Sequence, residues 1–233
     1  MASLKENYRA LVVGASGGIG SAIVEALRAD PRCGGVIRLS RRDNPRFDVT
    51  DEASIAEEAQ RIASQVDGLD LIFNATGALT IDGIRPEKAL KAIDPQAMLR
   101  QFALNAVGPA LLLKHFAPLL PRDRRGIFAS LSARVGSIGD NHLGGWISYR
   151  AAKAAQNQIV RTAAIEIART RPLAVIAALH PGTVETGLSI GYRGAHAAVP
   201  ASEAAVNLLG VLDALPPESS GGFFAYDGSV VEW

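Results

Sequence analysis

The chain has 233 residues, of which 48% are hydrophobic and 20% charged, and its formal net charge at pH 7 is +1. This is the composition of an ordinary globular domain, and the near-neutral charge excludes a nucleic-acid surface built on a basic excess. Cys33 is the single cysteine, which excludes an intramolecular disulfide and a cysteine-based zinc cluster; no metal is expected, and a reducing cytoplasm is the expected location.

The length fits one domain spanning residues 1–233. The first ten residues lack the apolar stretch of a secretory signal, and no unbroken apolar run of about 18 residues or more is present. We therefore expect neither export nor membrane spanning.

The first half of the chain alternates between strand and helix patterns. Residues 8–30 begin with an apolar run, pass through a glycine-rich turn and continue with apolar residues at helical spacing, which predicts a strand, a loop and a helix. Residues 34–44 predict a second strand, residues 50–66 a helix with an acidic first turn, and residues 69–79 a buried strand that enters a loop.

The second half continues this alternation. Residues 86–120 predict one or two helices, and the later predicted elements are a strand at 126–132, a long helix at 144–160, a strand at 171–182, a helix at 201–215 and a strand at 221–228. Such alternation predicts an α/β fold of the Rossmann type, a doubly wound parallel sheet between two layers of helices. Residues 135–145 and 183–198 are expected to be irregular loops that carry function.

The sequence GASGGIG, residues 14–20, follows the first predicted strand and opens the first predicted helix. Gly14 permits a tight turn, Gly18 lets the backbone approach a phosphate, and Gly20 lets helix and strand pack closely. The helix N-terminus offers unpaired N–H groups to a pyrophosphate, so we expect a dinucleotide here. A glycine-rich turn without a ligand is the alternative.

Ser40, Arg41 and Arg42 lie at the end of the second predicted strand, where an NAD site usually carries an acid. A hydroxyl and two guanidinium groups suit a 2′-phosphate instead, which favours NADP(H) over NAD(H). A solvated arginine pair is the alternative. Asp48 and Val49 lie where side chains meet an adenine ring.

Tyr149 and Lys153 are four residues apart in the predicted long helix, so they share one face. A lysine cation beside a tyrosine lowers the phenol pKa toward the range of a general acid. Taken alone, the pair also fits an exposed amphipathic helix face.

These motifs resemble, in order, those of the classical short-chain dehydrogenase/reductase family over nearly the whole chain. The matching residues are Gly14, Gly18 and Gly20; Asn74, Ala75 and Gly77 in NATG; Asn105 in NAVG; Tyr149 and Lys153; and Pro181 and Gly182 in HPGTVET. Within the family, residues 133–155 and the C-terminal sequence resemble the branch that contains the C-factor signalling protein and sniffer-type carbonyl reductases.

The resemblance implies an NADPH-dependent carbonyl reductase or alcohol dehydrogenase acting on a small or medium organic substrate, in a homodimer or homotetramer. Tyr149 is the implied general acid, Lys153 its helper and ribose ligand, and Asn105 the holder of a relay water. The implied cofactor contacts also include Ser16, Ile19, Val184 and Thr186. Asp140, Asn141, His142, Trp146 and Leu188 are the expected substrate-pocket residues. A cofactor-binding signalling protein with little turnover is the alternative function.

The chain departs from the family at a serine. The branch usually carries Ser-Ser at the end of the fifth family strand, and this chain has Ser132 and Ala133. The second serine, normally the oxyanion donor, is therefore alanine. Ser132 serves only if the strand end is turned by one residue, because successive side chains point to opposite faces; Ser137 is the other candidate. We favour Ser132.

Overall fold

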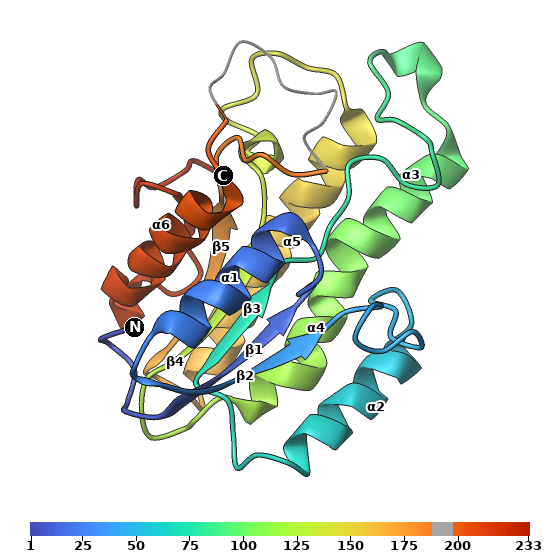
Figure 1. Ribbon diagram of the computed structural model, residues 1–233. Helices are drawn as coiled ribbons and strands as arrows, with labels where there is room; N and C mark the ends of the chain where they lie inside the picture. The colour runs from blue at the N-terminus through green and yellow to red at the C-terminus, as the bar shows by residue number, and fades with distance from the viewer. Residues whose placement is uncertain (188–197) are drawn as a thin grey trace.

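The computed structural model describes residues 1–187 and 198–233. Its centre is a six-stranded parallel sheet with the strand order β2-β1-β3-β4-β5-β6, covered by helices on both faces (Figure 1). The strands are β1 (Tyr8–Val13), β2 (Cys33–Leu39), β3 (Leu71–Asn74), β4 (Gly126–Leu131), β5 (Ala174–His180) and β6 (Phe223–Ala225). The strand order reverses at β1 and β3, so a crevice is expected at their carboxyl ends.

The α-helices alternate with these strands, as the sequence predicted. They are α1 (Gly18–Ala29), α2 (Glu52–Ala63), α3 (Pro95–Phe102), α4 (Gly108–Phe116), α5 (Ile147–Ala168) and α6 (Ala201–Ala214). A π-helical segment, η2 (Ala103–Val107), joins α3 to α4, and the short 3₁₀ turns are η1 (Leu90–Ala92), η3 (Ala117–Leu119), η4 (Arg134–Gly136) and η5 (Pro217–Ser219). The predicted Rossmann-type architecture is confirmed.

The sheet separates two apolar clusters because side chains alternate along each strand. Leu11 and Val13 of β1 join the cluster under α2, α4 and α5, which includes Ile55, Phe116 and Val160. Ala10 and Val12 join the opposite cluster, which α1 and α6 cover. All these residues are fully buried, so the two layers hold the strand ends in place.

The predicted helical region at residues 86–120 contains two α-helices, α3 and α4, as expected; a π-helical segment joins them, and the 3₁₀ turns η1 and η3 flank the pair. Pro95–Leu119 is the helical stretch, within the described part of the chain, whose length and mean hydropathy of 1.2 match a membrane-spanning helix. Polar residues such as Gln101 and Lys114 break its apolar sequence. Core-covering helices meet the same criterion, and Leu112 and Phe116 here belong to the buried cluster.

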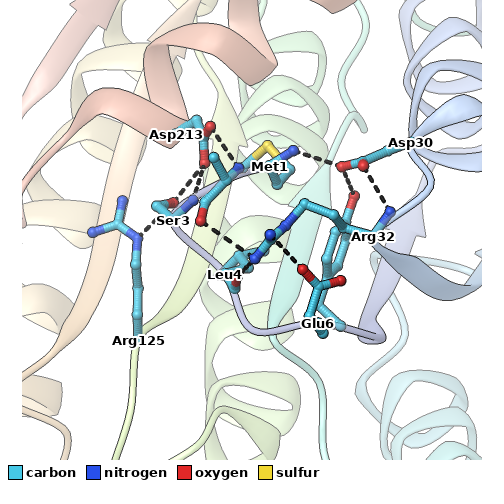
Figure 2. Close-up of polar contacts among 10 residues, drawn as sticks. Met1, Ser3, Leu4, Glu6, Asp30, Arg32, Arg125 and Asp213 are labelled. Carbon is cyan, nitrogen blue, oxygen red and sulfur yellow. Dashed lines mark hydrogen bonds and ion pairs between the residues drawn. The ribbon is translucent and has the colours of Figure 1, made fainter.

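The segment before β1 is tied down at the amino-terminal edge of the sheet (Figure 2). The Met1 ammonium donates to Asp30 at 2.5 Å, and the backbone N–H groups of Ala2 and Ser3 donate to Asp213 of α6, each at 2.8 Å. Arg125, directly before β4, donates to the Ser3 hydroxyl at 3.0 Å. This network clamps three elements at the edge opposite the strands' carboxyl ends.

Candidate active site

The glycine loop between β1 and α1 is built for close backbone contact. Gly14 has φ +81°, and a Cβ there would lie 2.9 Å from the backbone carbonyl of Ala75. A Cβ on Gly20 would lie 2.2 Å from the Gly14 oxygen. Gly17 is the N-cap of α1 and offers no side chain to its free N–H groups, and the first turn holds no acid. These groups suit an anion such as a pyrophosphate.

Two adjoining clefts lie at the carboxyl edge of the sheet, with volumes of about 570 and 440 Å³. Gly17 and the turn from Ala75 to Gly77 line both clefts. The clefts therefore meet over the glycine loop and the end of β3, which is the crevice expected at the point where the strand order reverses. Together they offer an extended groove of the kind that a dinucleotide needs.

The first cleft gathers residues that the sequence proposed for the adenosine end. Ser16, Ser40, Arg41, Asp48 and Val49 line it. Arg42 does not; its backbone N–H donates to the Ser40 hydroxyl at 3.2 Å. The sequence analysis missed Asp43, whose carboxylate accepts from the Ser40 hydroxyl and pairs with Arg38 at 3.2 Å. An acid therefore does lie beside this strand end, with a guanidinium partner.

Asn74 does not line either cleft; it binds the turn after β3 by hydrogen bonds. Its Oδ1 accepts from the Thr76 N–H at 3.0 Å and from the Thr76 hydroxyl at 2.6 Å, while its Nδ2 donates to the Ser130 hydroxyl at 2.9 Å. Asn74 and Ser130 are fully buried. The asparagine thus holds the Ala75–Gly77 turn in the shape that lines both clefts.

Tyr149 and Lys153 lie in the second cleft on one face of α5. They are 6% and 3% exposed, so the alternative of an exposed helix pair does not apply. The Lys153 ammonium lies 5.9 Å from the centre of the tyrosine ring. It donates to the Leu131 carbonyl at 3.1 Å and to Gln156 Oε1 at 2.8 Å.

Burial sets the ionisation of both groups. It raises the pKa of Tyr149 above that of a free phenol, whereas the sequence analysis expected a lowered pKa. The expectation was wrong for this state of the protein because desolvation of the phenolate outweighs a cation that is bonded elsewhere. Burial lowers the pKa of Lys153 to about 7, which brings its ionisation into the neutral range.

Asn105 lies on the π-helical segment, a geometry often found at functional sites. Its Nδ2 donates to the Ala78 carbonyl at 2.9 Å and to Gln101 Oε1 at 2.7 Å, and its Oδ1 accepts from the Ala78 N–H at 3.1 Å. A Cβ on Gly77 would lie 3.0 Å from this Oδ1 and 3.3 Å from Lys153 Nζ. Asn105 Oδ1 and Lys153 Nζ therefore both lie close to Gly77.

Neither candidate serine offers a free hydroxyl proton to the second cleft. Ser132 lines the second cleft, but its hydroxyl donates to Asn157 Oδ1 at 2.6 Å. Ala133 lines the cleft without a hydroxyl. Ser137 is buried outside the cleft lining and accepts from the Asp140 N–H at 3.1 Å. Of the two candidate serines, Ser132 is thus the one that lines the cleft, and its hydroxyl donates to α5.

The segment after β5 closes the second cleft over the glycine loop. Residues of the HPGTVET sequence line it, namely His180, Pro181, Gly182, Thr183, Val184 and Thr186, together with Gly18, Ile19 and Gly20 from the loop. A Cβ on Gly18 would lie 2.6 Å from Thr186 Cγ2, so the two segments touch. Burial lowers the pKa of His180 to about 4 and keeps this imidazole neutral.

Of the expected substrate-pocket residues, Trp146 lines the second cleft and stands edge-on to Tyr149 with ring centroids 6.5 Å apart. Asp140, Asn141 and His142 lie outside its lining: Asn141 and His142 are exposed, and the half-buried Asp140 pairs with Arg134 at 3.4 Å. Leu188 lies outside the described residues.

Glu87 was missed by sequence analysis. Its carboxylate accepts from the Ser148 N–H at 2.7 Å and from the Ser148 hydroxyl, and its carbonyl accepts from the Trp146 N–H at 2.6 Å. Glu87 therefore caps the helix that carries Tyr149, a favourable place for a negative charge. No local pattern relates Glu87 to Ser148, 61 residues later.

Comparison with known proteins agrees with this geometry. A family model described as short chain dehydrogenase matches residues 8–195. The chain is 33% identical over 190 residues to 1-hydroxy-2-glutathionyl-2-methyl-3-butene dehydrogenase of Rhodococcus sp. (strain AD45), covering 81% of this chain and 79% of the relative. It is 38% identical over 149 residues to C-signal of Myxococcus xanthus, covering 62% of this chain and 84% of the relative.

Solved structures share the fold. The NADPH-bound carbonyl reductase from chicken fatty liver superposes with a TM-score of 0.83 at 25% identity, over 99% of this chain and 95% of the other. Carbonyl reductase Sniffer of D. melanogaster superposes with a TM-score of 0.82 at 21% identity, over 98% of this chain and all of the other. The glycine loop, the Tyr149 and Lys153 pair and the family match lead to one conclusion: the chain belongs to the short-chain dehydrogenase family of oxidoreductases.

Proposed function

We propose that the protein is an NADP(H)-dependent carbonyl reductase or alcohol dehydrogenase for a small or medium organic substrate. The observation that carries this proposal is the burial of Tyr149 and Lys153 in the second cleft, which adjoins the first cleft at Gly17 and the Ala75–Gly77 turn. The Rhodococcus relative is named as a dehydrogenase of a hydroxy compound, which supports chemistry between an alcohol and a carbonyl.

The cleft residues fit a nicotinamide dinucleotide. The glycine loop, with its positions that exclude a Cβ, would hold the pyrophosphate, and the Ala75–Gly77 turn and Pro181–Gly182 would border the nicotinamide half. When bound, the nicotinamide supplies or accepts the hydride.

Tyr149 is the proton donor in the reductive direction. Because burial raises its pKa, the phenol stays protonated at neutral pH and has a proton for the substrate oxygen. The phenolate that remains lies beside the Lys153 ammonium, which stabilises it. Substrate oxidation runs the same transfer backwards.

The choice of NADP(H) is supported by Ser40 and Arg41, which line the first cleft and offer a hydroxyl and a guanidinium group to a 2′-phosphate. Asp43 would oppose a 2′-phosphate, but Arg38 pairs with its carboxylate and reduces that effect. NADPH-bound and NADP-bound structural relatives support the same choice.

The test is NADPH consumption by the purified protein across aldehydes, ketones and quinones, with Tyr149→Phe in parallel. We expect turnover in the wild type and its loss in Tyr149→Phe, with cofactor binding by nicotinamide fluorescence unchanged. Tyr8→Phe is the matched control, because Tyr8 bonds Asp30 at the opposite edge of the sheet. Turnover that survives in Tyr149→Phe would contradict the proposal.

A second candidate function is that of a cofactor-binding signalling protein with little turnover. It is favoured by Ala133 and by the donation of the Ser132 hydroxyl to Asn157, which together leave the cleft without a free serine proton at this position. C-signal is among the relatives. Tight NADPH binding without turnover on any panel member would favour this function.

We also propose that the protein is a homo-oligomer that pairs through α3, η2 and α5. Leu99, Val107 and Ile165 are each about half or more exposed on these elements, and contact with a second copy would cover them. Light scattering is the test, and a monomeric mass at micromolar concentration would contradict the proposal.

A further inference from the structure

Lys153 is a buried cation held by uncharged oxygens. Its two hydrogen bonds go to the Leu131 carbonyl and to Gln156 Oε1. The described lining of the second cleft contains no aspartate or glutamate. An ammonium that loses water needs other partners to remain charged, so each of these two oxygens matters.

Gln156 lies three residues after Lys153 on α5 and is fully buried. Its Nε2 donates to the Ser130 hydroxyl at 2.8 Å and to the Leu131 carbonyl at 2.9 Å. A carbonyl only accepts, so the amide nitrogen must face Leu131 and the amide oxygen must face Lys153. The orientation of Gln156 is therefore determined by its own partners.

The hydrogen bonds continue from Gln156 through Ser130 and Asn74 to the turn after β3, which lines both clefts. Ser130 also accepts from Asn74 Nδ2 at 2.9 Å, and Asn74 holds Thr76 in the turn between the two clefts. Asn74, Ser130 and Gln156 are fully buried, and Lys153 is nearly so. A buried polar chain thus joins the ammonium to the turn after β3.

We propose that Gln156 is a positioning residue that holds the Lys153 ammonium in its charged form and in its place beside Tyr149. The consequence for turnover rests on the proposed function; the effect on the lysine itself does not. Because Lys153 ionises in the neutral range, loss or gain of one partner changes the fraction that is charged at working pH.

The other titratable groups that line the second cleft do not replace Gln156. Tyr149 lies on the same helix, Arg134 comes from the turn after β4, and His180 comes from the end of β5. Arg134 is itself a cation, and His180 is neutral because burial lowers its pKa. From the π-helical side, Asn105 is uncharged and already bonded to Ala78 and Gln101.

The test measures the ionisation of Lys153 in Gln156→Met and Gln156→Glu. Methionine keeps the length and removes the amide acceptor, whereas glutamate supplies a carboxylate. Gln158→Met is the matched control, because Gln158 is exposed on the same helix and bonds Thr162. The probe is the side-chain NMR titration of ¹³C-labelled lysine in the cofactor-free protein, in which Lys153→Met identifies the Lys153 signal among five lysines.

We expect the Lys153 midpoint to fall by about one pH unit in Gln156→Met and to rise by about one pH unit in Gln156→Glu. Gln158→Met should leave it unchanged. Midpoints that stay at the wild-type value, or that move in the same direction in both variants, would overturn the proposal. If Gln156→Met does not fold, the required rise in Gln156→Glu decides the question.

Kinetics provide a second readout. The alkaline limit of kcat/KM for reduction should move down in Gln156→Met and up in Gln156→Glu, because reduction needs the charged lysine. If the alkaline limit of kcat/KM stays in place while the NMR midpoints of Lys153 move, the proposed effect of Gln156 on turnover is overturned. If the NMR midpoints move but the wild type turns over no substrate, the proposed function fails and the assignment of Gln156 to Lys153 stands.

Discussion

Replacing Lys153 with methionine should stabilise the cofactor-free protein at neutral and acidic pH while removing its activity. Burial lowers the lysine pKa from 10.5 to about 7. At about 1.4 kcal/mol per pH unit, this difference corresponds to an upper limit of roughly 4 to 5 kcal/mol of destabilisation by the charged side chain. The variant no longer carries the destabilisation from the buried charge. It leaves Gln156 Oε1 without its donor, however, which lowers the free energy of unfolding by about 1 to 3 kcal/mol at every pH.

The pH dependence follows from the proton balance. Between about pH 7 and pH 10.5 the unfolded chain keeps the lysine proton that the folded chain has lost, so wild-type stability rises with pH. Below pH 7 both states are protonated and the full penalty is present. The stability advantage of Lys153→Met should therefore be largest near pH 6 and shrink by about 1.4 kcal/mol per pH unit above pH 7.

The assay is urea unfolding of both proteins from about pH 6 to pH 9.5, below the titration of the tyrosines. Lys114→Met is the matched control, because Lys114 is 61% exposed and pairs with Glu52 on the surface. It should show a constant difference from the wild type over this range. If the difference between Lys153→Met and the wild type is also constant with pH, then Lys153 is not a desolvated ammonium.

Arg41→Ala should weaken NADPH binding about tenfold or more and leave NADH binding nearly unchanged, since a guanidinium partner of the 2′-phosphate is lost; equal losses by fluorescence titration would contradict this. Glu87→Ala should reduce the free energy of unfolding by about 1 to 2 kcal/mol and lower kcat, because Ser148 loses its cap one residue before Tyr149. Unchanged kcat would mean that the cap is only structural. Ala133→Ser should raise kcat for reduction by adding a hydroxyl to the cleft; a rate equal to that of wild type would show that another donor already serves the oxyanion.

Much of the fold and part of the site follow from local sequence. The glycine loop can be predicted because Gly14 and Gly20 meet local backbone requirements of one turn. The shared face of Tyr149 and Lys153 can be predicted because it follows from the period of a single helix. The alternation of apolar strands and amphipathic helices likewise predicts the layered sheet, since each element must bury one face.

Only the tertiary structure decided which partners these residues have. Asp43 reaches Ser40 across a turn that the sequence analysis took for strand, and Ser132 gives its proton to Asn157 on α5. Gln156 reads in the sequence as one polar residue in a helix, and it becomes the partner of Lys153 because α5 packs against the end of β4.

The sign of the Tyr149 pKa shift shows the physical reason. Helical spacing alone brings a cation near the phenol and predicts a lowered pKa, but burial acts in the opposite direction and depends on every element that covers the side chain. Spacing along one helix is a local property, which sequence determines. Desolvation and the choice among competing hydrogen-bond partners depend on segments far apart in the chain, so they are decided only when the chain has folded.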